Sequence, residues 1–224
     1  EKSYQRQSHR FNHVPFIPTM INKEPATTAP QTPVSKAISM NRNSDAIRTA
    51  EQIRAQISKR PATILVGGQG NTNIASSVAL DIAKALSILG GESTLLVDLD
   101  HSQKLAQRIQ PEVETPLAQL QSGGNAPTQL LPNLAFCHAV SREGQATESL
   151  TENLQSLKAI KSGFDLTVAH TSSMSSNESY ALLTQVDYLL VTLEKGVSKL
   201  DEVTKLNEYC KSITQIPFAT LLCD

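Results

Sequence analysis

A short glycine-rich stretch is the first place where residue types and spacing in this sequence indicate chemistry. It reads Gly67-Gly68-Gln69-Gly70-Asn71-Thr72 and leads into a long apolar pattern with helical spacing. A glycine-rich turn that enters a helix directs several backbone N–H groups, and the positive end of the helix dipole, toward one point. Proteins cradle phosphate groups in this way, but such a turn also serves as a plain connection between a strand and a helix. On the turn alone, the two interpretations are equally favoured.

The turn departs from the full phosphate-binding pattern G-x-x-x-x-G-K-[ST]. With Gly70 as the last glycine, Leu65 replaces the first glycine and Asn71 replaces the lysine, whereas Thr72 keeps the hydroxyl that binds magnesium. The lysine neutralises charge that develops on the terminal phosphates during phosphoryl transfer. The pattern therefore predicts that phosphate binding can persist without turnover.

A pair of carboxylates follows at the end of the next predicted strand, in the run TLLVDLD. Asp98 and Asp100 stand at i and i+2, so their side chains project to the same side of the strand end and can hold magnesium or its waters. Acidic residues also end strands simply because the chain meets solvent there. The order of strand, glycine loop, helix and D-x-D strand is much less common by chance, and it favours the phosphate-binding interpretation.

Alternating strand and helix patterns must position these residues. Such alternation requires crossover connections, which predicts an α/β fold with a mainly parallel sheet flanked by helices on both faces. The expected elements are a helix from Ser44 that ends before Pro61, a strand at 62–66, a helix at 72–89, strands at 94–98 and 133–138, a helix at 147–160, a strand at 165–169, a helix at 178–184, a strand at 188–193, a helix at 197–210 and a strand at 218–222.

The composition is typical of one folded domain with a tail. The chain has 224 residues, of which 39% are hydrophobic and 18% are charged. Five of the eleven prolines fall at 15–33, in a segment without apolar periodicity. We therefore expect a flexible proline-rich linker at 1–43 and a folded domain at 44–224.

Charge and cysteine usage exclude some classes of function. The formal net charge is -1 at pH 7, which argues against nucleic acid as an obligate partner, because that partner requires a clustered positive surface. Cys137, Cys210 and Cys223 lack metal-ligand spacing and lie in or beside apolar runs. This is typical of free thiols in a reducing compartment, so we expect a cytosolic protein.

The order of glycine loop, long helix and LLVDLD resembles the MinD/ParA class of deviant P-loop ATPases. Within that class, residues 44–224 resemble the cytoplasmic domain of bacterial tyrosine autokinases, which partner polysaccharide chain-length regulators. The resemblance implies a P-loop NTPase-like three-layer sandwich. It also implies an inner-membrane chain-length regulator as partner, and a homo-oligomer through the helix at 45–54, whose Asp45-Ala-Ile-Arg48 and Glu51-Gln-Ile-Arg54 are similar to the family's ring-forming E-x-x-R-x-x-R motif.

Three departures from the family pattern affect the same function: Asn71, Leu65, and His170 at the position of the Walker B aspartate. Magnesium prefers hard oxygen ligands, so a neutral imidazole is a poor partner for it. A role for His170 as a general base or a metal ligand is less favoured, because no second His or Cys lies at ligand spacing. No catalytic residue is assigned. The resemblance implies Thr72 and Asp98 as the magnesium neighbours and, as nucleotide-binding candidates, Gly68, Gly70, Asn71, Thr72, Asp98 and Asp100.

The leading hypothesis is a catalytically degenerate tyrosine-autokinase-like domain, a regulatory or scaffold module in exopolysaccharide or capsule biosynthesis and export. It would be cytoplasmic, tethered at the inner-membrane face, with weak or absent binding of ATP or ADP with magnesium. Two alternatives stay open: an active ATPase or tyrosine kinase whose cation comes from a neighbouring subunit, and a MinD/ParA-like positioning protein. A lysine or arginine from elsewhere, poised over residues 68–72, would contradict the inert interpretation.

Overall fold

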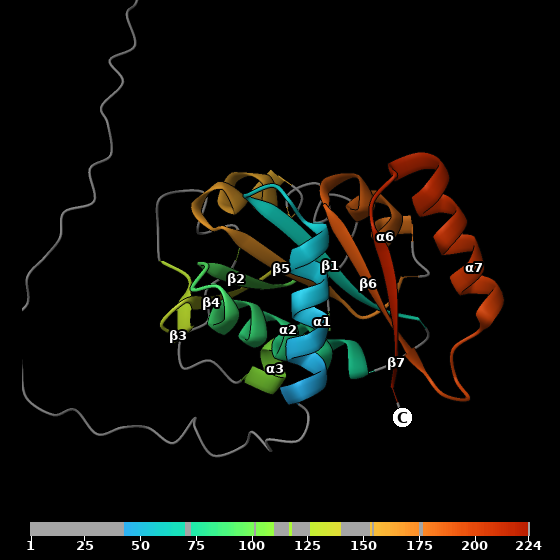
Figure 1. Cartoon of the computed structure of the whole chain (residues 1–224), viewed down its shortest axis with the longest axis horizontal. Helices are drawn as coiled ribbons and strands as arrows, with labels where there is room; N and C mark the ends of the chain where they lie inside the picture. The colour runs from blue at the N-terminus through green and yellow to red at the C-terminus, as the bar shows by residue number, and fades with distance from the viewer. Residues whose placement is uncertain are drawn as a thin grey trace, which may run out of the picture. The chain divides into compact units, whose positions relative to one another are not determined.

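Seven strands form one sheet at the centre of the folded domain. The computed structural model describes residues 43–69, 73–100, 102–109, 117, 126–139, 153, 155–174 and 177–223. The strands lie in the order β3-β4-β2-β5-β1-β6-β7 (Figure 1). Only β3 and β4 pair antiparallel, and every other neighbouring pair is parallel. The bounds are β1 (Ala62–Gln69), β2 (Thr94–Asp98), β3 (Thr128–Leu131), β4 (Leu134–His138), β5 (Leu166–Thr171), β6 (Tyr188–Glu194) and β7 (Phe218–Cys223).

Helices cover both faces of this sheet, so the predicted three-layer α/β architecture is confirmed. One hydrophobic core lies between the sheet and α1 (Asn43–Gln56), α2 (Ile74–Leu89) and α3 (Lys104–Ile109). A second core lies on the other face, under the helical residues 155–160, α6 (Asn177–Leu182) and α7 (Leu200–Tyr209). Short helical turns complete the described elements: η3 (Lys161–Gly163), η4 (Leu183–Gln185) and the π-helical turn η5 (Cys210–Thr214).

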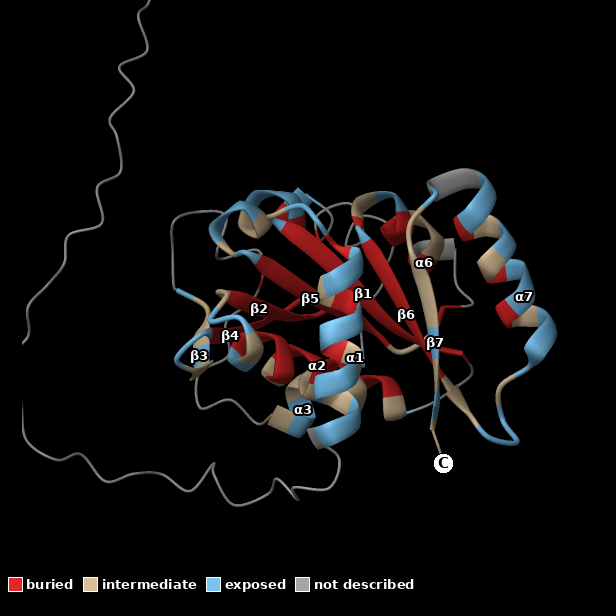
Figure 2. Cartoon of the chain, in the orientation of Figure 1, coloured by how far each residue is buried: buried red, intermediate tan, exposed pale blue. Residues whose placement is uncertain are grey.

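The central strands are buried along their whole length because helices cover them on both sides. Every residue of β1, β2, β4 and β5 is buried, and Figure 2 shows this as a continuous red centre beneath helices whose outer faces are exposed. Parallel strands of this kind are near-continuous apolar runs. In α2, small residues at helical spacing, among them Ala75, Ala79 and Ala83, face the sheet and bring the helix close to it.

Strand β1 is longer than predicted, and the prediction that it ends at Val66 was wrong. Gly68 pairs with Thr192 and Gln69 with Leu193, so the strand continues along β6 as far as Gln69. Two elements, α3 and β3, were not predicted. The helix predicted at 72–89 begins at Ile74, after Thr72, which lies outside the described residues.

Two further predictions fall mainly outside the described residues. Of the linker predicted at 1–43, only Asn43 is described, and it begins α1. Of the helix predicted at 147–160, the structure describes residues 153 and 155–160, which are helical. None of the helices in the described ranges combines the length and the hydrophobicity that a membrane span requires.

Candidate functional site

Three titratable side chains lie side by side where the central parallel strands end. The register places Asp98 of β2 opposite His138 of β4 on one side and opposite His170 of β5 on the other. Side chains in register share a face of the sheet, and this face is the one covered by α2 and α3, because Leu96 and Val168, two residues earlier on their strands, belong to that core.

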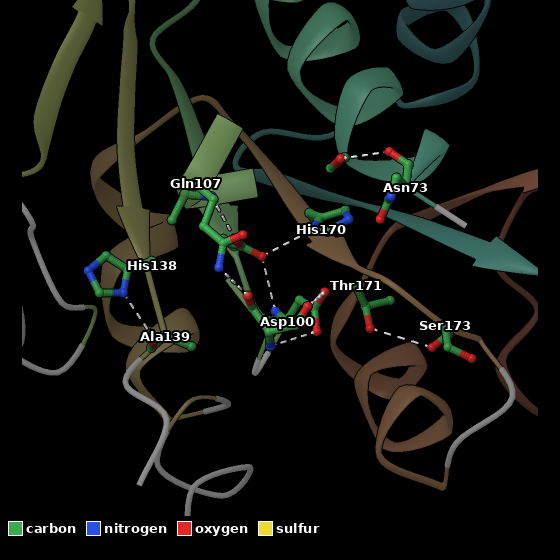
Figure 3. Close-up of polar contacts among 12 residues, drawn as sticks. Asn73, Asp100, Gln107, His138, Ala139, His170, Thr171 and Ser173 are labelled. Carbon is green, nitrogen blue, oxygen red and sulfur yellow. Dashed lines mark hydrogen bonds and ion pairs between the residues drawn. The ribbon is translucent and has the colours of Figure 1, made fainter. Parts of the chain in front are cut away.

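The carboxylate of Asp98 is fully buried and accepts three hydrogen bonds. Its Oδ1 atom lies 2.9 Å from Nδ1 of His170 and 3.1 Å from the backbone nitrogen of Asp100. Its Oδ2 atom lies 2.9 Å from the backbone nitrogen of Ala106, in the first turn of α3. Helices leave their first N–H groups without intrahelical partners, so Asp98 both fixes the start of α3 and binds the imidazole. His170, labelled in Figure 3, is only 1% exposed.

The second carboxylate of the D-x-D run makes different contacts. The Asp100 carboxylate accepts two hydrogen bonds from Ser102. The backbone nitrogen of Ser102 lies 3.1 Å from Oδ1, and the Ser102 hydroxyl lies 2.6 Å from Oδ2. Each of the two carboxylates is therefore hydrogen-bonded to donors of the chain itself. Within the described ranges, no group of three or more His, Cys, Asp and Glu residues is placed to hold a metal ion. Thr72 lies outside those ranges, so its pairing with Asp98 at magnesium stays a prediction.

The glycines at the end of β1 have packing roles. A side chain at Gly67 would overlap Met174, which lies against this strand. The backbone oxygen of Gly68 accepts a hydrogen bond from the backbone nitrogen of Met174 at 2.8 Å, and that of Gln69 accepts one from the hydroxyl of Ser198 at 2.7 Å. Part of the glycine-rich signal in the sequence thus has a structural cause.

This extension of β1 limits the backbone that is left to cradle a phosphate. The positions that correspond to the first five residues of the phosphate-binding pattern, 65–69, all lie in the strand. The connection to α2 is left to residues 70–73, of which Gly70, Asn71 and Thr72 lie outside the described residues. Asn73 precedes α2, and its side chain makes no capping hydrogen bond.

A cleft between the start of α2 and α3 carries two positive charges. It has a volume of about 340 Å³ and is lined by Asn73, Ser76, Lys104, Gln107 and Arg108. Figure 3 shows Asn73 and Gln107 on these two elements. Sequence reasoning missed Lys104 and Arg108 because it did not predict α3. The signal that was available is their i, i+4 spacing, which places two basic side chains on one face of a helix.

The charged residues predicted to form a subunit contact on α1 divide into two groups. Arg54 forms a 3.0 Å ion pair with Glu92, which also binds Arg60 at 2.9 Å, so Arg54 contacts the loop before β2 in its own domain. Arg48 forms an exposed 3.1 Å pair with Asp45. The Arg48–Asp45 pair is therefore the more accessible of the two groups to a second subunit.

The architecture defined by this sheet and its helices is that of bacterial tyrosine kinase domains and ParA/MinD-type ATPases, which confirms the predicted class at the level of the fold. Among solved structures, the chimerical protein CapA2B2 superposes with a TM-score of 0.67 at 13% identity, covering 80% of this chain and 83% of that one. The kinase domain of VpsO superposes with a TM-score of 0.65 at 15% identity, covering 81% of this chain and 95% of that one. A ParA family ATPase from Chlorobium tepidum superposes with a TM-score of 0.55 at 13% identity, covering 72% of this chain and 73% of that one. No protein-family model and no curated protein matches the sequence.

Proposed function

We propose that this protein is a catalytically degenerate tyrosine-kinase-like domain that serves as a regulatory or scaffold module in polysaccharide biosynthesis and export. The fold shared with bacterial tyrosine kinase domains supports the class. The observation that carries the degeneracy is the buried hydrogen bond between His170 and Asp98. In this proposal the fold is retained for contacts with other proteins, and phosphoryl transfer is lost.

The His170 imidazole is hydrogen-bonded to Oδ1 of Asp98, the oxygen that a magnesium ion would need as a ligand. A carboxylate accepts hydrogen bonds and donates none, so the proton lies on Nδ1 of His170 and points at Oδ1 of Asp98. An ion at that oxygen would have to break a hydrogen bond that is shielded from water, and it would meet a nitrogen donor where magnesium prefers oxygen. The chain itself therefore supplies the hydrogen-bond donor that Asp98 binds at this oxygen.

The glycine-rich segment at the end of β1 also supports the loss of phosphoryl transfer. A phosphate cradle needs several free backbone N–H groups that converge on one point. Residues 65–69 belong to β1, and Asn71 replaces the lysine that would neutralise the terminal phosphates. Lys104 and Arg108 share a cleft with Asn73 and Ser76 at the start of α2, and the described residues Gly68 and Gln69 do not line it. The proposed loss therefore concerns magnesium-dependent transfer and leaves anion binding open.

An assay of Mg-ATP hydrolysis tests the degeneracy. We expect the wild-type chain to hydrolyse ATP at the same background rate as Asp98→Asn, which keeps the shape of the side chain and removes its charge. We also expect no higher rate of hydrolysis from Asn71→Lys alone, because Oδ1 of Asp98 is still hydrogen-bonded to His170. Wild-type hydrolysis well above background that is lost in Asp98→Asn would contradict the proposal and establish an active ATPase.

The scaffold role has a separate test in the partner. Bacterial tyrosine autokinases, which the sequence resembles, act with an inner-membrane polysaccharide chain-length regulator, and we propose the same kind of partner and a location at the cytoplasmic face of that membrane. Co-purification of the chain with such a regulator, undiminished in Asp98→Asn, is the expected result. Binding that requires an intact Asp98 and added Mg-ATP would instead indicate a nucleotide-driven switch.

A further inference from the structure

We propose that the cleft between α2 and α3 binds the phosphate or diphosphate group of a small anionic molecule without a metal ion. The proposal goes beyond the scaffold function, because it assigns a ligand class to residues that the phosphate-loop pattern does not include. Lys104, Gln107 and Arg108 come from α3, and Asn73 and Ser76 come from the start of α2.

The charge of the lining is the first argument. Among the described residues that line the cleft, Lys104 and Arg108 are cations and none is acidic. Lys104 and Arg108 stand one helical turn apart on α3, so their charged groups can reach the same ligand. Within the described part of the chain, the guanidinium of Arg108 has no hydrogen bond or ion pair. Guanidinium and ammonium groups bind phosphate oxygens by charge-assisted hydrogen bonds.

The two carboxylates at the end of β2 do not pair with Arg108. Asp98 is hydrogen-bonded to His170 and to the backbone of Asp100 and Ala106. Asp100 is hydrogen-bonded to Ser102. Since both carboxylates have partners elsewhere, an incoming anion meets the Arg108 guanidinium without first displacing an internal carboxylate from it.

Neutral donors and the size of the cleft narrow the class of ligand. The amides of Asn73 and Gln107 add hydrogen-bond donors beside the two cations, and the Asn73 side chain is not used as a helix cap. A volume of about 340 Å³ lies at the lower end of the range for small-molecule pockets, roughly 300–1,000 Å³. This suits a phosphate or diphosphate on a small organic group.

The expected binding is independent of metal because the side chains supply the positive charge. In phosphate loops that bind ATP, magnesium bridges the terminal phosphates and is held by a hydroxyl and a carboxylate. In this chain the Asp98 carboxylate is bound to His170, while the cations at the cleft are fixed to the chain. Chelation of divalent ions therefore leaves the proposed site intact.

Isothermal titration calorimetry of the full chain in EDTA, with inorganic pyrophosphate and with ADP as separate probes, tests the proposal. We expect both probes to bind, and the double variant Lys104→Gln/Arg108→Gln to weaken binding by about tenfold or more. The matched control is Lys205→Gln/Lys211→Gln, which removes two exposed cations from α7 and η5 and should bind as the wild type does. Far-UV circular dichroism of each variant verifies the fold.

The two probes separate the sources of affinity. Equal affinities for pyrophosphate and ADP assign recognition to the phosphates alone, and tighter binding of ADP adds contacts to its organic part; both support the site. No binding in EDTA, binding that appears only with magnesium, or an equal loss in the control variant would overturn it. The hydrolysis assay measures catalytic degeneracy separately, so a failure of the cleft proposal and a failure of the proposed function give different results.

Discussion

Asp98 shows how one neighbouring side chain, His170, determines the contacts of a buried carboxylate. The carboxylate keeps its place at the end of β2, and its charge is fully buried. Burial of a carboxylate is costly unless it is paired and hydrogen-bonded. His170 and two backbone N–H groups supply those partners. With Asp98 satisfied inside the protein, a bound metal is not needed to stabilise it.

A second carboxylate, at the opposite ends of the strands, makes a pH-dependent contribution to stability. The Oδ2 atom of Asp165 accepts hydrogen bonds from the backbone nitrogen and the hydroxyl of Ser93, at 2.9 and 2.8 Å. These bonds to Ser93 hold the pKa of Asp165 below its ordinary value. Because the folded-state pKa is lower than the unfolded one, the contribution is complete above the unfolded pKa and is lost as the pH falls through the folded pKa.

We therefore expect Asp165→Asn to lower the free energy of unfolding at pH 7, with a difference from wild type that shrinks below about pH 4. Because the side chain is exposed, the effect should be small. Urea unfolding between pH 7 and pH 3 measures it. Ser93→Ala removes the donor hydroxyl and should reduce the same pH dependence. A difference that stays constant over this range would show that the hydrogen bonds to Ser93 do not act through the charge of Asp165.

At the scale of elements, the extension of β1 decides how much of the glycine-rich segment is available to a ligand. The strand continues to Gln69 because β6 offers pairing partners that far. Gly67 permits this arrangement, since its missing side chain leaves the space that Met174 fills from the loop after β5. The same contact covers the strand end on the face opposite α2.

Gly67→Ala tests this packing. The added methyl group would overlap Met174 and would lie 3.2 Å from Cγ2 of Thr171. Overpacking of this kind costs about 1–3 kcal/mol, so we expect the free energy of unfolding to fall by that amount. In a Met174→Ala background the same change should cost less, because the obstructing side chain is gone. A double-mutant cycle from denaturant unfolding gives the coupling, and equal costs in both backgrounds would rule out the contact with Met174 as the cause.

The elements that sequence reasoning predicted and those it missed differ in length and burial. The strand at 94–98 was predicted with its observed bounds because it is a continuous apolar run that is buried on both faces. The helix α3 was missed because it has six residues, of which Leu105 alone is buried. The edge strand β3 was missed for a similar reason, since its residues are only partly buried or exposed.

The residues of the candidate site were predictable from the sequence, but the hydrogen bond between Asp98 and His170 was not. Asp98 and His170 were both singled out from sequence, and the resemblance placed His170 at the magnesium-orienting position. Their hydrogen bond depends on the register between β2 and β5, two strands that are 72 positions apart in the chain. The end of β1 was missed for the same kind of reason, because Gly67-Gly68-Gln69 has little strand propensity of its own and is held in the sheet by β6.

At the scale of the whole molecule, the described surfaces favour different roles. The cleft beside α2 carries the positive charges, Lys104 and Arg108. On α1, Arg48 and Asp45 form an exposed pair, while Arg54 is held by Glu92 within the domain. We propose that the exposed part of α1 forms the subunit contact. Neither proposed contact requires a metal ion, which agrees with the proposal of a module that keeps its contacts and lacks the transfer reaction.

The thermal stability of the wild-type chain and of His170→Asp, measured over a range of magnesium concentrations, tests the central claim most directly. We predict that the Tm of the wild type does not respond to magnesium. The Tm of His170→Asp should be lower in EDTA, because two buried carboxylates then face each other, and it should rise as magnesium binds between them. A wild-type Tm that rises with magnesium, and that no longer does so in Asp98→Asn, would contradict the account.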